Sequence, residues 1–169
     1  MHLAIILNMY GVIVKQTGDD FVPYVQQTFP QLKREEICRP WFKADVGELT
    51  SLEVWATLGF QGDLEQIEKE YLDTIELNDG FPEFIKAVSK RYNSISGDLK
   101  MQKPDERIFR LTVEQLGVEP EECLYVDDRR RNLAAAQSLG MKAVMLNSRN
   151  VEWDGDVVQN FEELVAKVL

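Results

Sequence analysis

One short apolar run and a series of segments with helical periodicity dominate the first half of the chain. Residues 3–7 (Leu-Ala-Ile-Ile-Leu) are all apolar, a pattern typical of a parallel strand that is covered on both faces. Gly11 ends this strand. Apolar side chains then recur at helical spacing, which predicts helices over residues 19–29, 34–42, 63–75 and 81–92.

Two local signals refine these helices. Thr50 and Glu53 match a capping box, which predicts the start of a short helix that Gly59 ends. Pro40 is expected to interrupt the helix over residues 34–42, because proline removes a backbone hydrogen-bond donor. Large aromatic side chains are predicted to form the core of this helical block: Trp41, Phe42, Trp55 and Phe60. Their burial against a partner chain is the alternative.

The periodicity changes in the second half, where short apolar strands alternate with helices. The predicted strands cover residues 94–96, 124–126 and 142–146, and the predicted helices cover residues 104–116, 129–139 and 160–168. Such alternation indicates a parallel sheet. We therefore predict an α/β fold, with a Rossmann-like parallel sheet that is shortened to about four strands. The sheet is assigned to residues 1–14 and 79–169, and a helical insert after the first strand to residues 15–78.

The sheet also predicts where a functional site would lie. Ligand sites of open α/β sheets form beyond the carboxyl ends of the strands. In this chain those ends fall at Asn8, Ser96, Asp127 and Leu146. Polar residues at three of these ends make this edge the predicted position of the site.

Three segments carry motif-like residues in a fixed order. Residues 5–13 read Ile-Ile-Leu-Asn-Met-Tyr-Gly-Val-Ile, residues 103–109 read Lys-Pro-Asp-Glu-Arg-Ile-Phe, and residues 124–128 read Leu-Tyr-Val-Asp-Asp. Together they resemble the opening motif (Asp-x-Asp-Gly-Val after an apolar strand), the lysine motif and the acidic motif of the haloacid dehalogenase (HAD) superfamily of hydrolases. The resemblance covers nearly the whole chain. It implies that residues 15–78 form a small helical cap.

The resemblance implies a role for each matching residue. Asn8 stands at the position of the nucleophilic aspartate, Tyr10 at that of the acid/base aspartate, and Lys103 at that of the lysine that offsets negative charge. Asp127 and Asp128, together with Asn8, stand at the positions that hold magnesium. Lys103 is also a candidate for contact with phosphate.

The residues at the two reacting positions depart from the family pattern. The amide of Asn8 is a far poorer nucleophile than a carboxylate, and the phenol of Tyr10, with a pKa of about 10, is a poor base at neutral pH. We therefore expect a pseudoenzyme that binds a small phosphorylated ligand or a protein partner, with a Mg²⁺ site that is weakened or lost. The alternatives are an active magnesium-dependent phosphohydrolase that uses a non-standard residue, and a structural subunit of a complex.

A second departure concerns the short segment before Lys103. Family members usually place a strand ending in Ser or Thr, and then a helix, ahead of the lysine motif. The favoured interpretation is that this unit, with its phosphate contact, is missing here. In the competing alignment Ser96 is that contact, so that Ser96 and Lys103 are the phosphate-binding residues.

Composition narrows the classes of function. The formal net charge of -10 argues against binding to nucleic acid or to anionic lipid, and residues 3–7 are too few to span a membrane. His2 is the only histidine, which argues against histidine metal sites and Ser-His triads. The chain has two cysteines and no secretory signal pattern, so a reducing, cytoplasmic location is expected. Cys123 is predicted to be a buried structural thiol. The sequence sets no oligomeric state.

Overall fold

The computed structural model describes residues 4–16, 19–88, 103–146 and 150–168, which divide into two compact units. We name them the sheet unit and the helical unit. The sheet unit comprises the described residues within Met1–Lys15, Leu77–Ser94 and Lys103–Leu169. The helical unit comprises the described residues within Gln16–Glu76. No helix in these ranges is long and apolar enough to cross a membrane.

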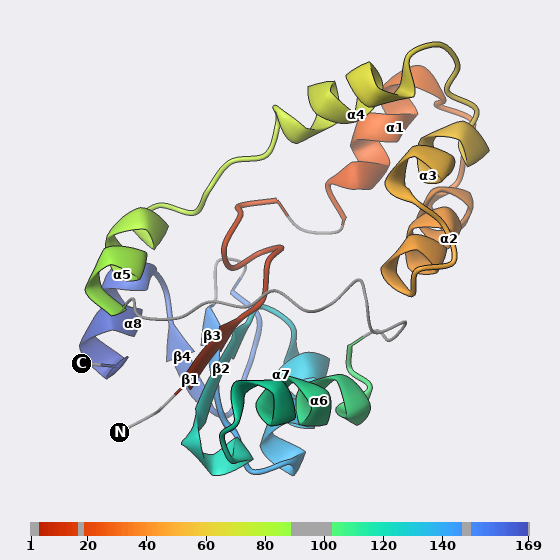
Figure 1. The fold of residues 1–169 in the computed structure, drawn as a ribbon. Coiled ribbons are helices and arrows are strands. Elements are labelled where there is room, and N and C mark those ends of the chain that lie inside the picture. Colours follow the sequence, from red (N-terminus) through yellow and green to blue (C-terminus); the bar gives the residue numbers. More distant parts are fainter. Residues whose placement is uncertain (1–3, 17–18, 89–102, 147–149, 169) are drawn as a thin grey trace. The chain divides into compact units, whose positions relative to one another are not determined.

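The sheet unit is built on four parallel strands in the order β1-β2-β3-β4 (Figure 1). The strands are β1 (Ala4–Leu7), β2 (Cys123–Asp127), β3 (Lys142–Leu146) and β4 (Asp156–Val158). The helices of this unit are α5 (Phe81–Val88), α6 (Glu106–Leu116), α7 (Arg130–Ser138) and α8 (Phe161–Val168), and a short 3-10 helix, η1 (Pro120–Glu122), precedes β2. This parallel sheet with flanking helices confirms the predicted α/β, Rossmann-like fold.

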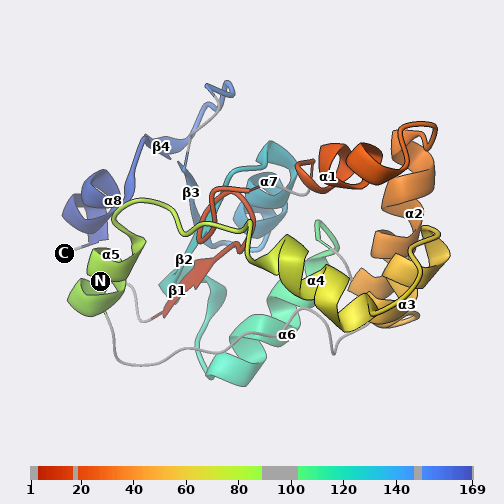
Figure 2. The same cartoon turned by 90° about the horizontal axis from the view of Figure 1, so that it is seen from above.

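Helices cover both faces of the sheet. Figure 2 shows α5 and α8 on one side of the strands and α6 and α7 on the other. The core on the first side joins strand residues to helix residues: Leu124, Val126, Val144, Leu146 and Val158 with Phe84, Phe161 and Leu164. Tyr125 points to the opposite face, because successive side chains of a strand alternate, and its ring meets that of Phe109 on α6 at 5.1 Å.

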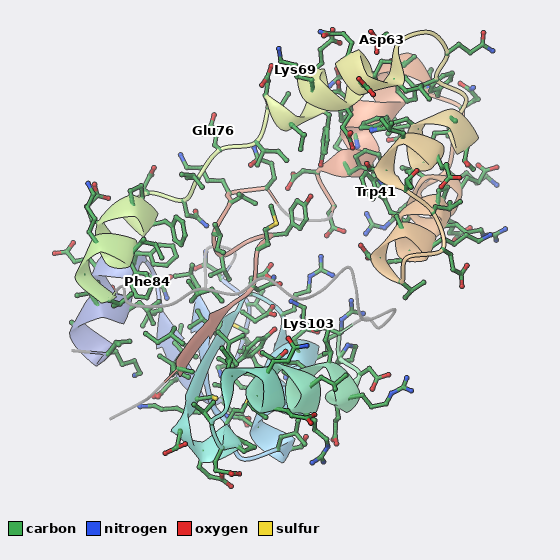
Figure 3. The ribbon with its side chains drawn as sticks, in the orientation of Figure 1. Trp41, Asp63, Lys69, Glu76, Phe84 and Lys103 are labelled. Carbon is green, nitrogen blue, oxygen red and sulfur yellow. The ribbon has the colours of Figure 1, made fainter. Side chains whose placement is uncertain are left out.

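The helical unit is organised around one buried tryptophan. Its helices are α1 (Phe21–Thr28), α2 (Arg34–Asp45), α3 (Ser51–Thr57) and α4 (Leu64–Leu72). Trp55 is completely buried and meets the rings of Phe21, Phe60 and Tyr71 edge-on at 5.2, 5.2 and 5.6 Å. Trp41, labelled in Figure 3, packs edge-on against Phe21 at 4.8 Å. These contacts confirm the predicted aromatic core for Trp41, Trp55 and Phe60.

The predicted capping box is also present in this unit. The backbone N–H of Glu53 donates to Thr50 Oγ1 over 3.2 Å, and the backbone N–H of Thr50 donates to Glu53 Oε2 over 2.7 Å. Two otherwise unpaired donors at the start of α3 are thereby satisfied. Asp63 caps α4 in a similar way, since its side chain accepts from the backbone N–H of Gln66 over 3.1 Å.

Several details of the fold differ from the sequence predictions. α2 continues through Pro40, because burial of its apolar face with Ile37 offsets the hydrogen bond that proline removes. Phe42 is 55% exposed, so it does not belong to the aromatic core. β4, with only three residues, was not predicted. The predicted strand over residues 94–96 lies outside the described residues.

The loop after β1 turns sharply at Gly11, whose φ is +79°. Ile13 N–H donates to Met9 O over 2.9 Å, which closes the turn. A Cβ atom on Gly11 would lie 2.5 Å from Asp128 Oδ2, inside van der Waals contact. Gly11 is therefore required both for the backbone conformation and for the close approach of Asp128.

The same loop is tied to the chain that leads into α5. The side-chain amide of Asn78 donates to Val12 O over 2.6 Å, and the backbone N–H of Asn78 donates to Ile13 O over 2.9 Å. Lys15 also forms an ion pair with Asp79 at 3.1 Å. Residues 12–15 and 77–79 thus run side by side, and this arrangement fixes the loop that follows β1.

Gly11→Ala is expected to destabilise the protein more than Gly117→Ala, its matched control. Gly117 also has a positive φ, +66°, but a Cβ atom there would meet nothing within 4 Å. The control should lose about 1 kcal/mol from backbone strain alone, and Gly11→Ala at least about 2 kcal/mol, since overpacking is added. Urea unfolding followed by circular dichroism measures both. Equal losses would show that the approach of Asp128 adds nothing.

The two thiols should differ strongly in reactivity. Cys123 is completely buried, and burial, assisted by the charges of Glu122 and Glu121, raises the pKa of its thiol to about 11. Because the thiolate is the reactive form, iodoacetamide at pH 8 should modify the half-buried Cys38 well before Cys123. Peptide mass spectrometry measures both rates, with the urea-unfolded protein as the control. Equal labelling of the two cysteines in the folded protein would contradict this prediction.

Candidate functional site

The parallel pairing of β1 with β2 brings two distant parts of the chain together at one edge of the sheet. Leu7 lies opposite Val126 in the register, and the backbone N–H of Asn8 donates to Val126 O over 2.9 Å. Asn8 therefore lies beside Asp127 and Asp128, although about 120 positions separate them. All three side chains are at least nine-tenths buried. The edge predicted from the sequence thus holds three of the predicted site residues.

Lys103 joins this group from the segment that precedes α6. Its ammonium Nζ donates to Asn8 Oδ1 over 2.6 Å. In Figure 3 the labelled Lys103 lies near the same edge of the sheet. A lysine ammonium can only donate, so the atom of Asn8 that faces it must be the amide oxygen. The amide nitrogen of Asn8 consequently points the other way.

The amide nitrogen of Asn8 faces two oxygen atoms. It donates to the backbone oxygen of Tyr10 over 2.7 Å and to Asp128 Oδ1 over a longer 3.4 Å. The side chain of Asn8 therefore bridges a cation on one side and a carboxylate on the other. Each polar atom of this buried amide has a protein partner.

Asp128 is a buried carboxyl group in a crowded position. Burial, together with the neighbouring charge of Asp127, raises the pKa of Asp128 to about 6, while Arg129 acts in the opposite direction. Gly11 lies against its oxygen atoms and leaves no room for a side chain. Asp128 is thus held close to Asn8 and ionises less readily than an exposed aspartate.

Asp127 makes a different set of contacts. Its Oδ2 atom accepts from the phenol of Tyr125 and from the amide of Asn132, the latter over 3.0 Å, and its Oδ1 atom accepts from Arg129 N–H over 2.8 Å. Three donors therefore compensate this completely buried carboxylate. They also fix the turn between β2 and α7, as expected for an aspartate that bonds the backbone two residues on.

Sequence reasoning did not identify Tyr125 and Asn132 as part of this site. Alternation along β2 could have placed Tyr125 on the face of Asp127, since the two residues are two positions apart. Asn132 lies in the first turn of α7 and has no comparable signal. Its Oδ1 atom is buried and, within the described residues, has no hydrogen-bond partner. The pKa of Tyr125 lies well above 10.0, because burial and the charge of Asp127 both oppose ionisation.

Of the other residues that the sequence predicted for the site, Tyr10 and Leu146 lie at this edge of the sheet. Tyr10 is half-buried and contributes its backbone oxygen to Asn8. Leu146 ends β3 at the same edge of the sheet. Ser96 lies outside the described residues, so its predicted phosphate contact stays a prediction. Lys103, the other residue predicted to contact phosphate, bonds to Asn8.

The residues at this edge do not fit a divalent cation well. Magnesium favours carboxylate and carbonyl oxygen atoms, and Asp128 Oδ1 and Tyr10 O are of that kind. Both atoms already accept hydrogen bonds from Asn8, and Asp127 is engaged by three protein donors. Among the described residues no group of three or more His, Cys, Asp or Glu side chains is arranged to hold a metal ion.

Comparison with known proteins relates this arrangement to a family. The family model of haloacid dehalogenase-like hydrolases matches residues 64–140, which include the lysine and acidic motifs. Among curated proteins, a drimenol cyclase from Aspergillus calidoustus is 21% identical over 187 residues, covering 89% of this chain and 35% of its own length. A CBBY-like protein from Arabidopsis thaliana is 36% identical over 61 residues, covering 36% of this chain and 19% of its own length. The chain thus spans about a third or less of the length of these curated relatives.

Solved structures share the fold along nearly the whole chain. An HAD phosphatase from Thermococcus onnurineus superposes with a TM-score of 0.68 at 19% identity, covering 99% of this chain and 98% of that one. This similarity supports the fold. The chain thus resembles haloacid dehalogenase-like hydrolases, whose family model matches residues 64–140 and whose fold it shares along nearly its whole length.

Proposed function

We propose that this chain is an HAD-like domain that has lost hydrolysis and serves in binding. The observation that carries the proposal is the state of Asn8. Its amide oxygen accepts from Lys103 over 2.6 Å, and its amide nitrogen donates to Tyr10 O and Asp128. A nucleophile needs an available, electron-rich atom, and the only electron-rich atom of this side chain is bound to a cation.

The residue at the acid/base position supports the same proposal. Tyr10 carries a phenol where the family pattern has a carboxylate. A phenol can donate a proton, but with a pKa near 10 it is a poor base for activating water at neutral pH. Loss of both groups removes the formation of a covalent intermediate and also its hydrolysis. A single substitution at position 8 would not restore the full reaction cycle.

The proposed ligand is a small phosphorylated molecule or an acidic group on a protein partner. Lys103 provides positive charge at the edge of the sheet where ligands of α/β proteins bind. Met9 lies next to Asn8 in the chain and is 52% exposed, which adds an apolar surface at this edge.

The helical unit is proposed to act as the small cap that family resemblance implies. The structural similarity also extends to an HAD family enzyme from Bacteroides thetaiotaomicron that was solved with magnesium and inorganic phosphate.

Hydrolysis of p-nitrophenyl phosphate in the presence of magnesium tests the loss of catalysis. The natural protein is expected to show no turnover above the uncatalysed rate. The double variant Asn8→Asp, Tyr10→Asp should gain at least about a hundredfold, because it restores a nucleophile and a general acid. Release of p-nitrophenolate, measured on protein purified to homogeneity, gives both rates.

A triple variant that adds Asp128→Ala to the double variant is the matched control. It should lose the restored activity if the gain comes from this site. Turnover by the natural protein that disappears in Asp128→Ala would contradict the proposal and point instead to an active hydrolase with a different reacting group. Inactivity of the double variant would mean that more than the two reacting groups has been lost.

A further inference from the structure

The family that the chain resembles implies a divalent cation at the edge of the sheet, and the side chain of Asn8 lies where that cation would bind. Two oxygen atoms suited to a hard cation converge here, the backbone oxygen of Tyr10 and Oδ1 of Asp128. Both lie within hydrogen-bond distance of one atom, Asn8 Nδ2, at 2.7 and 3.4 Å. The point toward which these oxygens converge is therefore occupied by a nitrogen of the protein itself.

The orientation of this amide is fixed by its other end. Lys103 Nζ lies 2.6 Å from Asn8 Oδ1 and has no lone pair to offer, so a flipped amide would bring two donors together. A flip would also place the amide oxygen against the carboxylate of Asp128. Both changes are unfavourable, and the nitrogen consequently stays directed at Tyr10 O and Asp128.

The surroundings leave the side chain little freedom to move aside. Asn8 is 9% exposed, and its backbone N–H extends the pairing of β1 with β2 through the bond to Val126 O. Gly11 packs against Asp128 and has no room for any further atom. Displacing the amide would break three hydrogen bonds that are buried or half-buried, and buried polar groups are costly to leave unpaired.

Asp127 offers no substitute ligand. Its two oxygen atoms accept from Tyr125, Asn132 and Arg129 N–H, and it is completely buried. Of the two acidic residues in this motif, Asp128 is thus the one that faces Asn8. A cation at this point would find one carboxylate, that of Asp128. The other oxygen that it needs, Tyr10 O, already accepts from the amide of Asn8.

We infer that the amide nitrogen of Asn8 takes the place of a divalent cation between Tyr10 O and Asp128, so that this site is closed to Mg²⁺ and to Mn²⁺. The inference deepens the proposed loss of hydrolysis, on which it rests, because it makes ligand binding independent of metal. The inference says more than that position 8 lacks a negative charge. A neutral side chain too small to reach the two oxygens would leave the position open.

Titration with Mn²⁺, followed by the electron paramagnetic resonance signal of the free ion, tests this inference without any measure of turnover. The natural protein is expected to bind no Mn²⁺ at this site. Asn8→Ala removes the amide without adding charge, and it should bind Mn²⁺ at least about tenfold more tightly than the natural protein. Asn8→Asp should bind more tightly still, and Asp128→Ala added to either variant should abolish the gain.

Two results would overturn the inference. Tight binding of Mn²⁺ by the natural protein, lost in Asp128→Ala, would show that the amide does not close the site. A gain in Asn8→Asp with none in Asn8→Ala would show that the missing carboxylate alone excludes the cation. Asn8→Ser serves if Asn8→Ala does not fold, because its hydroxyl is polar and too short to bridge the two oxygens.

The inference and the proposed function can fail separately. Binding of Mn²⁺ by a natural protein that hydrolyses nothing would sink the inference alone. Hydrolysis that persists in EDTA, by a natural protein that binds no Mn²⁺, would sink the proposed function alone. Asn160→Ala is the matched control for the Mn²⁺ titration, since it removes an amide that accepts from Glu163 N–H at the start of α8 and should leave binding unchanged.

Discussion

The parallel pairing of β1 with β2 is the constraint on which the site depends. It sets Leu7 opposite Val126, and it thereby places Asn8 next to the acidic pair that ends β2. A slip of one residue would turn the side chain of each β1 residue to the other face of the sheet. The same slip would break the bond from Asn8 N–H to Val126 O. The chemistry at this edge is therefore a consequence of the strand register as much as of residue type.

Charge balance explains why a neutral residue at position 8 suits the rest of the site. A carboxylate at position 8 would lie within hydrogen-bond distance of Asp128 and close to Asp127, so three negative charges would share a buried space. Such a cluster requires a cation beside Lys103, since like charges in a low-dielectric site raise one another's pKa. With the neutral Asn8, one lysine and a few N–H and O–H donors are sufficient. The neutral amide at position 8 thus allows protein donors alone to compensate these buried groups.

Much of the fold and part of the site could be predicted from the sequence. Continuous apolar runs identified β1, β2 and β3, and the rule on strand ends brought Asn8 and Asp127 to one edge. β4 was missed because three residues, Asp156–Val158, carry too little periodicity to indicate a strand. The exposure of Phe42 depends on how α2 turns against its neighbours, which residue type alone does not reveal.

The hydrogen bonds between side chains of the site could not be predicted from the sequence, for a physical reason. The bond from Asn132 to Asp127 depends on the angle at which α7 leaves β2. The direction of the Asn8 amide depends on Lys103, which reaches it from 95 positions further along the chain. Hydrogen bonds of side chains are set by differences of an ångström, whereas periodicity and motifs describe whole elements.

Retention of Lys103, Asp127 and Asp128 does not by itself argue for catalysis. Each is buried or half-buried and is compensated by polar partners, so removal of one member would leave another polar group unpaired in the interior. A buried polar group that is left without its partner costs roughly 1–3 kcal/mol, and more where the group is charged. Stability of the fold is therefore a sufficient reason for these residues to be present. Position 8 is different, because Asn8 satisfies its neighbours as a neutral amide, and the packing of the fold therefore does not require a carboxylate there.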